Sequence, residues 1–173
     1  MGKSETSTSA VCDTGPIIHL DKLDSVQLLS DFSLWVPKAV VDELHYHRPS
    51  AFNRISAFCQ VNESLEPLPP NLLALGRAFS LEKGEIEALS LMSCIPNAIL
   101  LTDDAAARLV AQQLGYRVHG TIGVLIRAIR QRNLTVDQVL ELLRAIPERS
   151  SLFVRSVLLE EIVRQVENKF NIT

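Results

Sequence analysis

Acidic side chains follow two short apolar segments of the sequence, at the points where buried strands would end. Asp13 closes the run SAVCD that begins at Ser9, and Asp103 and Asp104 follow the run AILLT at 98–102. In an open parallel sheet, functional side chains gather beyond the carboxyl ends of the strands. We therefore expect these carboxylates to meet at one edge of a sheet.

The helix expected over 37–47 carries a further acid on its more apolar side. Glu43 shares its face with Ala39 and Val40, whereas Asp42 lies among polar side chains. Residues three and four positions apart lie on the same surface of a helix. Glu43 is therefore the acid expected to point inward.

The helix expected over 84–94 repeats this arrangement. Glu85 lies with Ala88 and Leu89 in the first turn, whereas Glu87 lies on a less apolar face. Glu85 is therefore the second inward-facing acid from a helix.

Carboxylates that converge from separate segments repel one another, and each like charge raises the pKa of its neighbour. A bound divalent cation removes this conflict, and oxygen ligands without converging Cys or His favour Mg²⁺ or Mn²⁺ over zinc. Such a cation orients water, lowers its pKa and neutralises charge that develops on a phosphate. The residue types therefore predict phosphodiester hydrolysis at a Mg²⁺ or Mn²⁺ site made by Asp13, Glu43, Glu85 and one of Asp103 and Asp104.

Most of these acids also have a purely structural interpretation. Asp103 or Asp104 could cap the helix that follows, and Glu85 in a first turn favours the helix dipole whatever its function. Glu43 could pair with an arginine, while the sequence identifies no capping role for Asp13. The joint pattern, rather than any one position, supports a site.

Strand-like and helix-like segments alternate along most of the chain, which predicts an α/β fold with a parallel sheet covered by helices on both faces. The expected strands are 9–13, 34–36, 65–68, 98–102 and 116–119; the expected helices are 17–32 with a break near 21–24, 37–47, 50–59, 71–79, 84–94, 104–114, 121–132, 135–146 and 156–170. The last two helices have no strand after them. We therefore expect a disordered tail at 1–8, an α/β domain at 9–133, and a C-terminal helical extension at 134–173 packed on the domain or on a partner.

Composition limits the class of protein. The 173 residues are 47% apolar and 21% charged, as in an ordinary folded domain, and the net charge of −3 argues against a basic, sequence-independent nucleic-acid binder. No apolar run approaches the roughly 18–20 residues that cross a bilayer, so we expect no membrane span. Cys12, Cys59 and Cys94 lack metal-ligand spacing and are expected to be buried free thiols, which favours a cytoplasmic location.

Five stretches in order resemble the PIN-domain family of metal-dependent nucleases, which includes the toxins of many bacterial and archaeal toxin–antitoxin pairs. They are VCDTGPIIHL (11–20), VPKAVVDEL (36–44), LEKGEIEALSL (81–91), ILLTDDAAARLVAQQLG (99–115) and VHGTIGVLIRA (118–128). The pieces GEIEAL and HGTIGVL are similar to one PIN subgroup of mostly uncharacterised prokaryotic proteins. The resemblance implies a PIN-like three-layer α/β/α sandwich with a central parallel sheet and an acidic pocket, here over 9–133.

The resemblance also assigns residues. Asp13, Glu43 and Glu85 match the family's first three acids, and the fourth falls on Asp103 or Asp104, of which the subgroup's pattern favours Asp103.

Substrate contacts are expected from other positions. Thr14 fills the place of the family's small hydroxyl residue, where it would hold a phosphate oxygen or a water, and Arg108 is a candidate contact to the scissile phosphate. A salt bridge to one of the acids is the alternative for Arg108. Lys38, Arg48 and Arg54 could line a path for RNA, or could be ordinary solvated surface.

The function implied by the resemblance is a Mg²⁺- or Mn²⁺-dependent ribonuclease, with the toxin of a toxin–antitoxin system as one form of it. Its partners would be an RNA substrate, an antitoxin protein and a second copy of the chain. The main alternative is a catalytically inactive PIN-like module that binds protein or RNA. A phosphatase with Asp13 as nucleophile ranks last, because Gly15 stands where that chemistry commonly needs a second aspartate.

Overall fold

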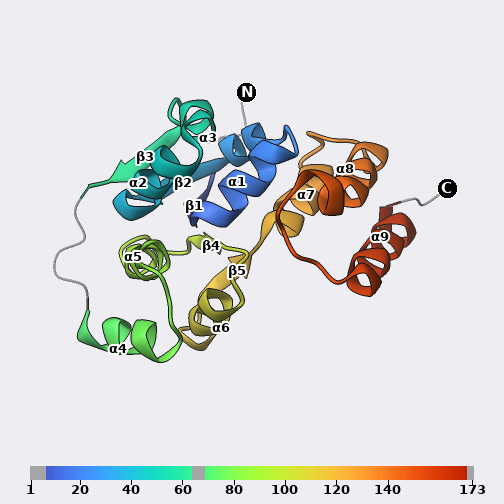
Figure 1. Cartoon of the computed structure of the whole chain (residues 1–173). Helices are drawn as coiled ribbons and strands as arrows, with labels where there is room; N and C mark the ends of the chain where they lie inside the picture. The colour runs from blue at the N-terminus through green and yellow to red at the C-terminus, as the bar shows by residue number, and fades with distance from the viewer. Residues whose placement is uncertain (1–6, 64–68, 171–173) are drawn as a thin grey trace, which may run out of the picture.

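The computed structural model describes residues 7–63 and 69–170. The elements are β1 (Thr8–Cys12), α1 (Thr14–Lys22), the 3₁₀ helix η1 (Val26–Asp31), β2 (Phe32–Pro37), α2 (Lys38–His47), α3 (Pro49–Ile55), β3 (Cys59–Asn62), α4 (Pro70–Ala78), α5 (Lys83–Met92), β4 (Ile99–Leu101), α6 (Ala105–Gln113), β5 (Arg117–His119), α7 (Thr121–Arg130), α8 (Val136–Arg149) and α9 (Ser156–Phe170) (Figure 1). Most of the tail expected at 1–8 and the strand expected at 65–68 lie outside the described residues.

The sheet has five strands in the order β3-β2-β1-β4-β5, and every pairing is parallel. Ala10 of the central strand pairs with Leu34 on one side and with Ile99 on the other. The ladder continues past the strand ends, because the main-chain N–H of Asp13 donates to the Leu101 carbonyl at 2.9 Å. The end of β1 and the end of β4 are therefore adjacent.

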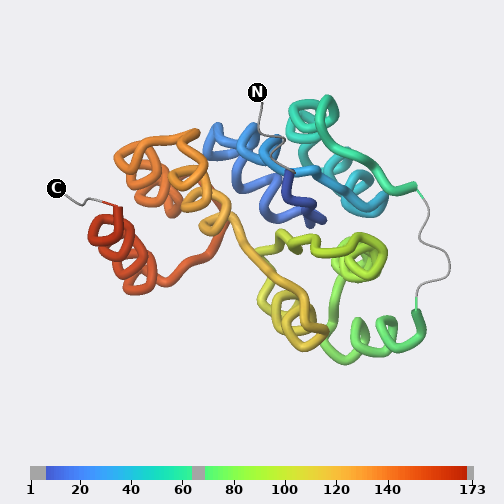
Figure 2. Tube along the Cα trace, turned by 180° about the vertical axis from the view of Figure 1, so that it is seen from behind, coloured from blue at the N-terminus to red at the C-terminus, as the bar shows by residue number. Residues whose placement is uncertain are grey.

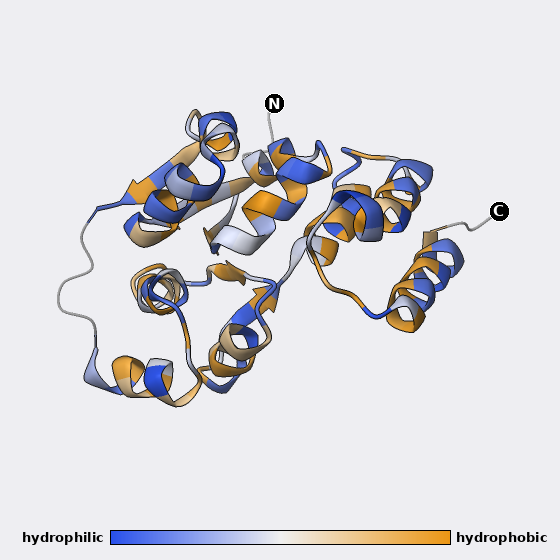
Figure 3. Ribbon diagram, in the orientation of Figure 1, coloured by the Kyte–Doolittle hydropathy of each residue, from blue (hydrophilic) through white to orange (hydrophobic). Residues whose placement is uncertain are grey.

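Alternate strand residues face the two helical layers, as the pleat of a strand requires. Ala10 and Cys12 belong to the core beneath α1, η1, α2, α3 and α7, whereas Val11 and Leu100 belong to the core beneath α4, α5 and α6. In Figure 3, β4 is coloured as apolar along its length, while the helices alternate between apolar and polar segments. The predicted α/β class and the three-layer arrangement are confirmed.

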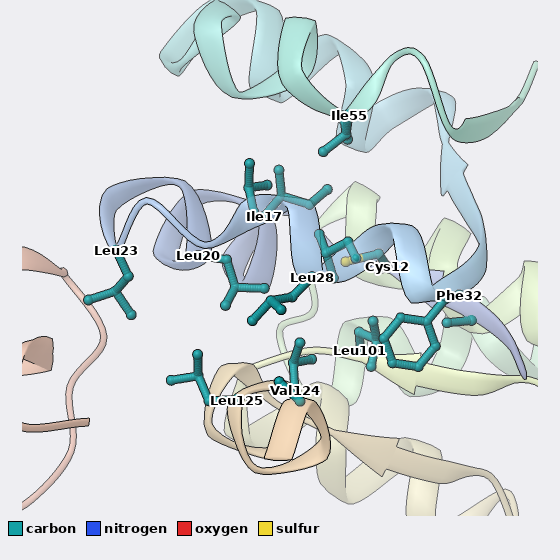
Figure 4. Packing of buried hydrophobic residues seen from close by; sticks show 14 of the residues in the cluster. Cys12, Ile17, Leu20, Leu23, Leu28, Phe32, Ile55, Leu101, Val124 and Leu125 are labelled. Atoms are coloured by element: carbon teal, nitrogen blue, oxygen red, sulfur yellow. The ribbon is translucent and has the colours of Figure 1, made fainter. Parts of the chain in front are cut away.

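The larger core joins segments that are far apart in the sequence. Figure 4 shows Ile17 beside Ile55 above α1, and Leu20 and Leu28 directed at Val124 and Leu125 of α7. Burying one such side chain contributes about 1.5–3 kcal/mol to folding. This packing fixes α1, which begins immediately after Asp13, against the sheet.

The C-terminal helices extend the same core. Helix α8 begins with a capping box between Thr135 and Gln138, and its residues Val139 and Leu143 are fully buried with the α7 side chains. Helix α9 follows α8 and contributes Leu159 to this cluster. Figure 2 shows the chain between α8 and α9 passing close to the start of α7.

Several sequence predictions were wrong in detail. The helix expected over 50–59 ends at Ile55, and Cys59 begins β3, an edge strand whose partly polar sequence gives little sign of a strand. The segment 17–32 is two elements because Asp24, with φ of 52°, breaks the helical path after Lys22.

The cysteine prediction holds only in part. Cys12 is buried, Cys59 is intermediate and Cys94 is exposed, although all three are free thiols. In the described ranges, no helix is long and apolar enough to cross a membrane.

Two arginines that could have lined an RNA path or been solvated surface have a structural role. Arg48 and Arg54 donate to the two carboxylate oxygens of Asp21 at 2.6 and 2.8 Å, and the Asp21 side chain is 1% exposed. Lys38 pairs with Asp42 one helical turn away. These three cations are therefore matched by acids.

Candidate active site

Asp13 lies where β1 ends and α1 begins, and it is 7% exposed. Its carboxylate does not cap the helix; Oδ2 accepts a hydrogen bond from the Thr102 hydroxyl at 3.0 Å. Burial and, to a smaller extent, the charges of Glu43 and Asp104 raise the pKa of Asp13 from 3.8 to about 6, against the hydrogen bonds from Thr14 and Thr102. Asp13 is thus a buried acid with like charges nearby.

Glu43 approaches Asp13 from α2. Its Oε2 accepts a hydrogen bond from the Thr14 hydroxyl at 2.5 Å. Gly84, at the start of α5, faces both acids, since a Cβ atom there would lie 3.7 Å from Asp13 Oδ1, 3.7 Å from Glu43 Oε2 and only 3.2 Å from Val40. The glycine therefore lets α5 come close to the carboxylates.

Glu85 faces the same site from the first turn of α5. Its Oε2 accepts the main-chain N–H of Glu82 at 2.8 Å in a capping box. Burial raises the pKa of Glu85 from 4.5 to about 7, and the charges of Asp13 and Asp104 add to this effect. Glu87 instead accepts the main-chain N–H of Ala39 at 2.9 Å, so it supports the start of α2 and lies away from the site.

Asp103 and Asp104 have different surroundings. Asp103 accepts three hydrogen bonds, from the N–H and hydroxyl of Thr121 at 2.8 and 2.6 Å and from His19 Nδ1 at 2.9 Å. Asp104 caps α6 by accepting the Ala107 N–H at 2.8 Å. A carboxylate has about four acceptor positions, so Asp104 keeps more of them available than Asp103 does.

The helix expected over 121–132 is α7, and its N-cap is Gly120. The Thr121 hydroxyl binds Asp103, and the helix start thereby holds this carboxylate. A Cβ atom at Gly120 would collide with Asp103 Oδ1, so this position also requires glycine for close approach.

All five predicted acids line one cavity of about 490 Å³ at the carboxyl edge of the sheet. Its lining residues are Asp13, Thr14, Gly15, Ile18, His19, Glu43, Glu82, Gly84, Glu85, Asp103, Asp104, Ala105, Ser151, Leu152 and Phe153. Six of these are acids, and no described lysine or arginine is among them. The cavity therefore has a strong negative potential.

The donor set fits a hard divalent cation, because it consists of carboxylate oxygens with one histidine and no thiol. Over residues 7–63 and 69–170, however, no three His, Cys, Asp or Glu side chains are already drawn together as a metal-binding group. Local hydrogen bonds and mutual repulsion hold the carboxylates apart. A cation would supply the attraction that brings them closer.

Of the two residues predicted to contact the substrate, one lies in the acidic cavity and the other beside it. Thr14 lies in the cavity on Glu43. Arg108 donates to the Thr102 carbonyl at 3.1 Å and lines an adjoining hollow together with Asp103. The alternative for Arg108 was a salt bridge to one of the acids, and among the described residues it forms no such salt bridge.

Sequence reasoning did not predict several other residues of the cavity. Glu82 could have been found from the spacing E-x-x-E of a capping box, and His19 from its position one turn after Gly15 on α1. Leu152 and Phe153 come from the chain between α8 and α9, and no local pattern indicates that they reach the site.

The raised pKa of Asp13 predicts a pH-dependent gain in stability for Asp13→Asn in the presence of a chelator. Below about pH 4 the acid is protonated in both states, so the substitution changes little; as pH rises toward 6, only the unfolded state ionises readily and the wild type loses stability. The free energy of unfolding of Asp13→Asn should exceed that of the wild type by at most about 3 kcal/mol above pH 7, which corresponds to roughly 6–12 °C in Tm.

Thermal unfolding of both proteins in EDTA from pH 4 to 8 measures this difference. The exposed Asp42→Asn variant is the matched control and should show no such gain. Equal melting temperatures for wild type and Asp13→Asn at pH 8 would contradict the proposed electrostatics.

Comparison with known proteins places this geometry in a family. A family model described as a PIN domain matches residues 9–168, nearly the whole chain. No curated protein and no solved structure matches it significantly. PIN domains have a nuclease-type fold, in agreement with the parallel sheet and the acidic cavity at its carboxyl edge. The chain belongs to the PIN-domain family.

Proposed function

We propose that this protein is a Mg²⁺- or Mn²⁺-dependent nuclease that hydrolyses phosphodiester bonds in RNA. The observation that carries the proposal is the cavity with six acids and no described lysine or arginine, formed by segments from both halves of the sheet. Such a concentration of like charge is costly without a cation. Burial first, and the neighbouring carboxylates to a smaller extent, raise the pKa values of Asp13 and Glu85.

Asp13, Glu43, Glu85 and Asp104 would hold the cation, because each keeps acceptor positions beyond its internal hydrogen bonds. Asp103, the acid that the family pattern favours, has about one position left and would contribute through it. When bound, a divalent cation in such a site activates water and neutralises charge on the phosphate.

Two threonine hydroxyl groups fix the orientation of carboxylates in the site. Thr14 and Thr102 donate to Glu43 and Asp13 and fix the direction of these carboxylates. Burial raises the pKa of Glu85 to about 7 in the metal-free protein, and a cation held by this carboxylate would lower it. One of the carboxylates would accept the proton of the attacking water.

Exposed apolar side chains on α9 are the basis for proposing a protein partner. Val157 and Leu158 of α9 are 78% and 53% exposed, which supports a second copy of the chain or an antitoxin protein on this helix. An inactive module that binds protein or RNA is the other candidate, because Glu85 already completes the capping box of α5 and Asp104 caps α6.

Cleavage of an unstructured RNA with Mn²⁺, with and without EDTA, tests the proposal. We expect cleavage with Mn²⁺ and none with excess chelator. Glu43→Gln should reduce the rate at least about a hundredfold, since a lost carboxylate ligand removes several kcal/mol of transition-state stabilisation. Asp42→Asn, the neighbouring acid paired with Lys38, is the matched control and should keep the wild-type rate.

Two results would reject the nuclease. One is cleavage that survives both EDTA and Glu43→Gln, which would indicate a contaminating enzyme. The other is an absence of Mn²⁺ binding in the millimolar range by calorimetry, which would favour the inactive module.

A further inference from the structure

Four arginines surround His119 on the β5 side of the sheet. The pKa of His119 is lowered by partial desolvation and then by the positive charges of Arg108, Arg117, Arg127 and Arg130. None of the four has a carboxylate partner in the described part of the chain, and the buried Nε of Arg127 has no hydrogen-bond partner. This region therefore carries positive charge that the protein does not neutralise.

Several other arginines of the molecule are matched by acids. Arg144 pairs with Glu167 at 2.7 Å, and Arg149 pairs with Asp24 at 2.5 Å. The net charge of −3 thus hides an uneven distribution. Cations without a carboxylate partner extend from Arg108, next to the acidic cavity, along α7 to Arg127, which donates to the Thr8 hydroxyl at the start of β1.

Three hollows adjoin one another in this region. The acidic cavity shares Asp103, Leu152 and Phe153 with a larger hollow of about 1210 Å³, which Arg108, His119 and Arg155 also line. The larger hollow shares His119 and Gly123 with a small one of about 80 Å³ that is lined by Arg127 and Arg130. We call this series of adjoining hollows the furrow; it leads from the acids past Arg108 and His119 to Arg127 and Arg130.

An exposed aromatic ring lies at the junction of the first two hollows. Phe153 is 86% exposed and lines both of them. Acidic residues of the larger hollow are partly neutralised, since Glu161 pairs with Arg164. Cations together with an exposed ring suit single-stranded nucleic acid, whose phosphates and unstacked bases are both accessible.

We propose that a single strand of RNA lies along this furrow, with a base stacked on Phe153 and its phosphates at Arg108, Arg127 and Arg130. The strand would enter the acidic cavity past Asp103. This inference rests on the proposed function for its choice of RNA, but RNA binding and RNA cleavage are measured separately.

Binding of a fluorescent, unstructured RNA in EDTA tests the arginines without cleavage. Removing two phosphate contacts with Arg108→Gln and Arg130→Gln together should weaken binding roughly ten- to thirtyfold at about 0.1 M salt, and should reduce the slope of log K against log salt by about 1.4. The matched control combines Arg77→Gln with Arg149→Gln, which removes the same charge from other surfaces. The control should change neither quantity by as much.

Phe153→Ala tests the stacked base. Affinity should fall roughly tenfold with an unchanged salt slope, because stacking involves no counterion release. An RNA duplex should bind more weakly than the single strand and should not respond to Phe153→Ala. The exposed ring makes few folding contacts, so the variant keeps its stability.

The outcomes separate the two proposals. Binding that depends on these arginines without any cleavage would support the furrow and reject the nuclease. Cleavage with arginine variants that bind like the control pair would reject the furrow and keep the nuclease. No RNA binding, together with a dimer that Phe153→Ala converts to a monomer, would identify the furrow as an interface between copies and overturn the inference.

Discussion

Replacing Asp13 with asparagine is expected to lower the rate of RNA cleavage about a thousandfold, because the variant loses the most buried carboxylate of the site and the several kcal/mol of transition-state stabilisation that its charge supports. Asparagine keeps the size of the side chain and can still accept the hydrogen bond from Thr102. Single-turnover cleavage with saturating Mn²⁺ measures the change in the chemical step.

The same substitution separates activity from folding. A misfolded variant would lose stability, whereas Asp13→Asn should melt at or above the wild-type temperature in EDTA at pH 8. A variant that retains more than about a tenth of the wild-type rate would show that the charge of Asp13 has little part in catalysis.

The largest expected effect on stability comes from removing both partners of Asp21. The double variant Arg48→Ala, Arg54→Ala leaves a carboxylate that is 1% exposed without any compensating charge. An uncompensated buried charge costs about 3–5 kcal/mol; because the arginines are 37% and 53% exposed, we expect the lower end, about 3 kcal/mol. Urea denaturation followed by circular dichroism measures the loss.

A triple variant that adds Asp21→Asn is the control for this experiment. Without the buried charge, much of the lost stability should return, although the arginines are still absent. If the double and triple variants unfold at the same urea concentration, the cost lies in lost arginine packing rather than in the buried carboxylate.

The choice between neighbouring acids was accessible from the sequence because helical spacing determines which side chains face inward. Asp42 and Glu87 were set aside for their polar faces, and the structure pairs Asp42 with Lys38 and places Glu87 on the Ala39 N–H. The acids at the ends of β1 and β4 were likewise predictable, since parallel strands direct their carboxyl ends to one edge.

Other features depend on contacts between distant segments, which local patterns do not encode. The three hydrogen bonds on Asp103 come from α1 and α7, so the sequence could not distinguish Asp103 from Asp104. The pairing of Arg48 and Arg54 with Asp21 was hidden for the same reason. Strand β3 was missed because its edge position removes the apolar alternation that identifies inner strands.

The chain between α8 and α9 supplies one wall of the acidic cavity through Ser151, Leu152 and Phe153, although every carboxylate comes from much earlier in the sequence. Under the proposed function, the reactive acids and this wall of their cavity are thus encoded in separate stretches of the chain. Mutations in the late stretch would then change access to the cavity and leave its carboxylates in place.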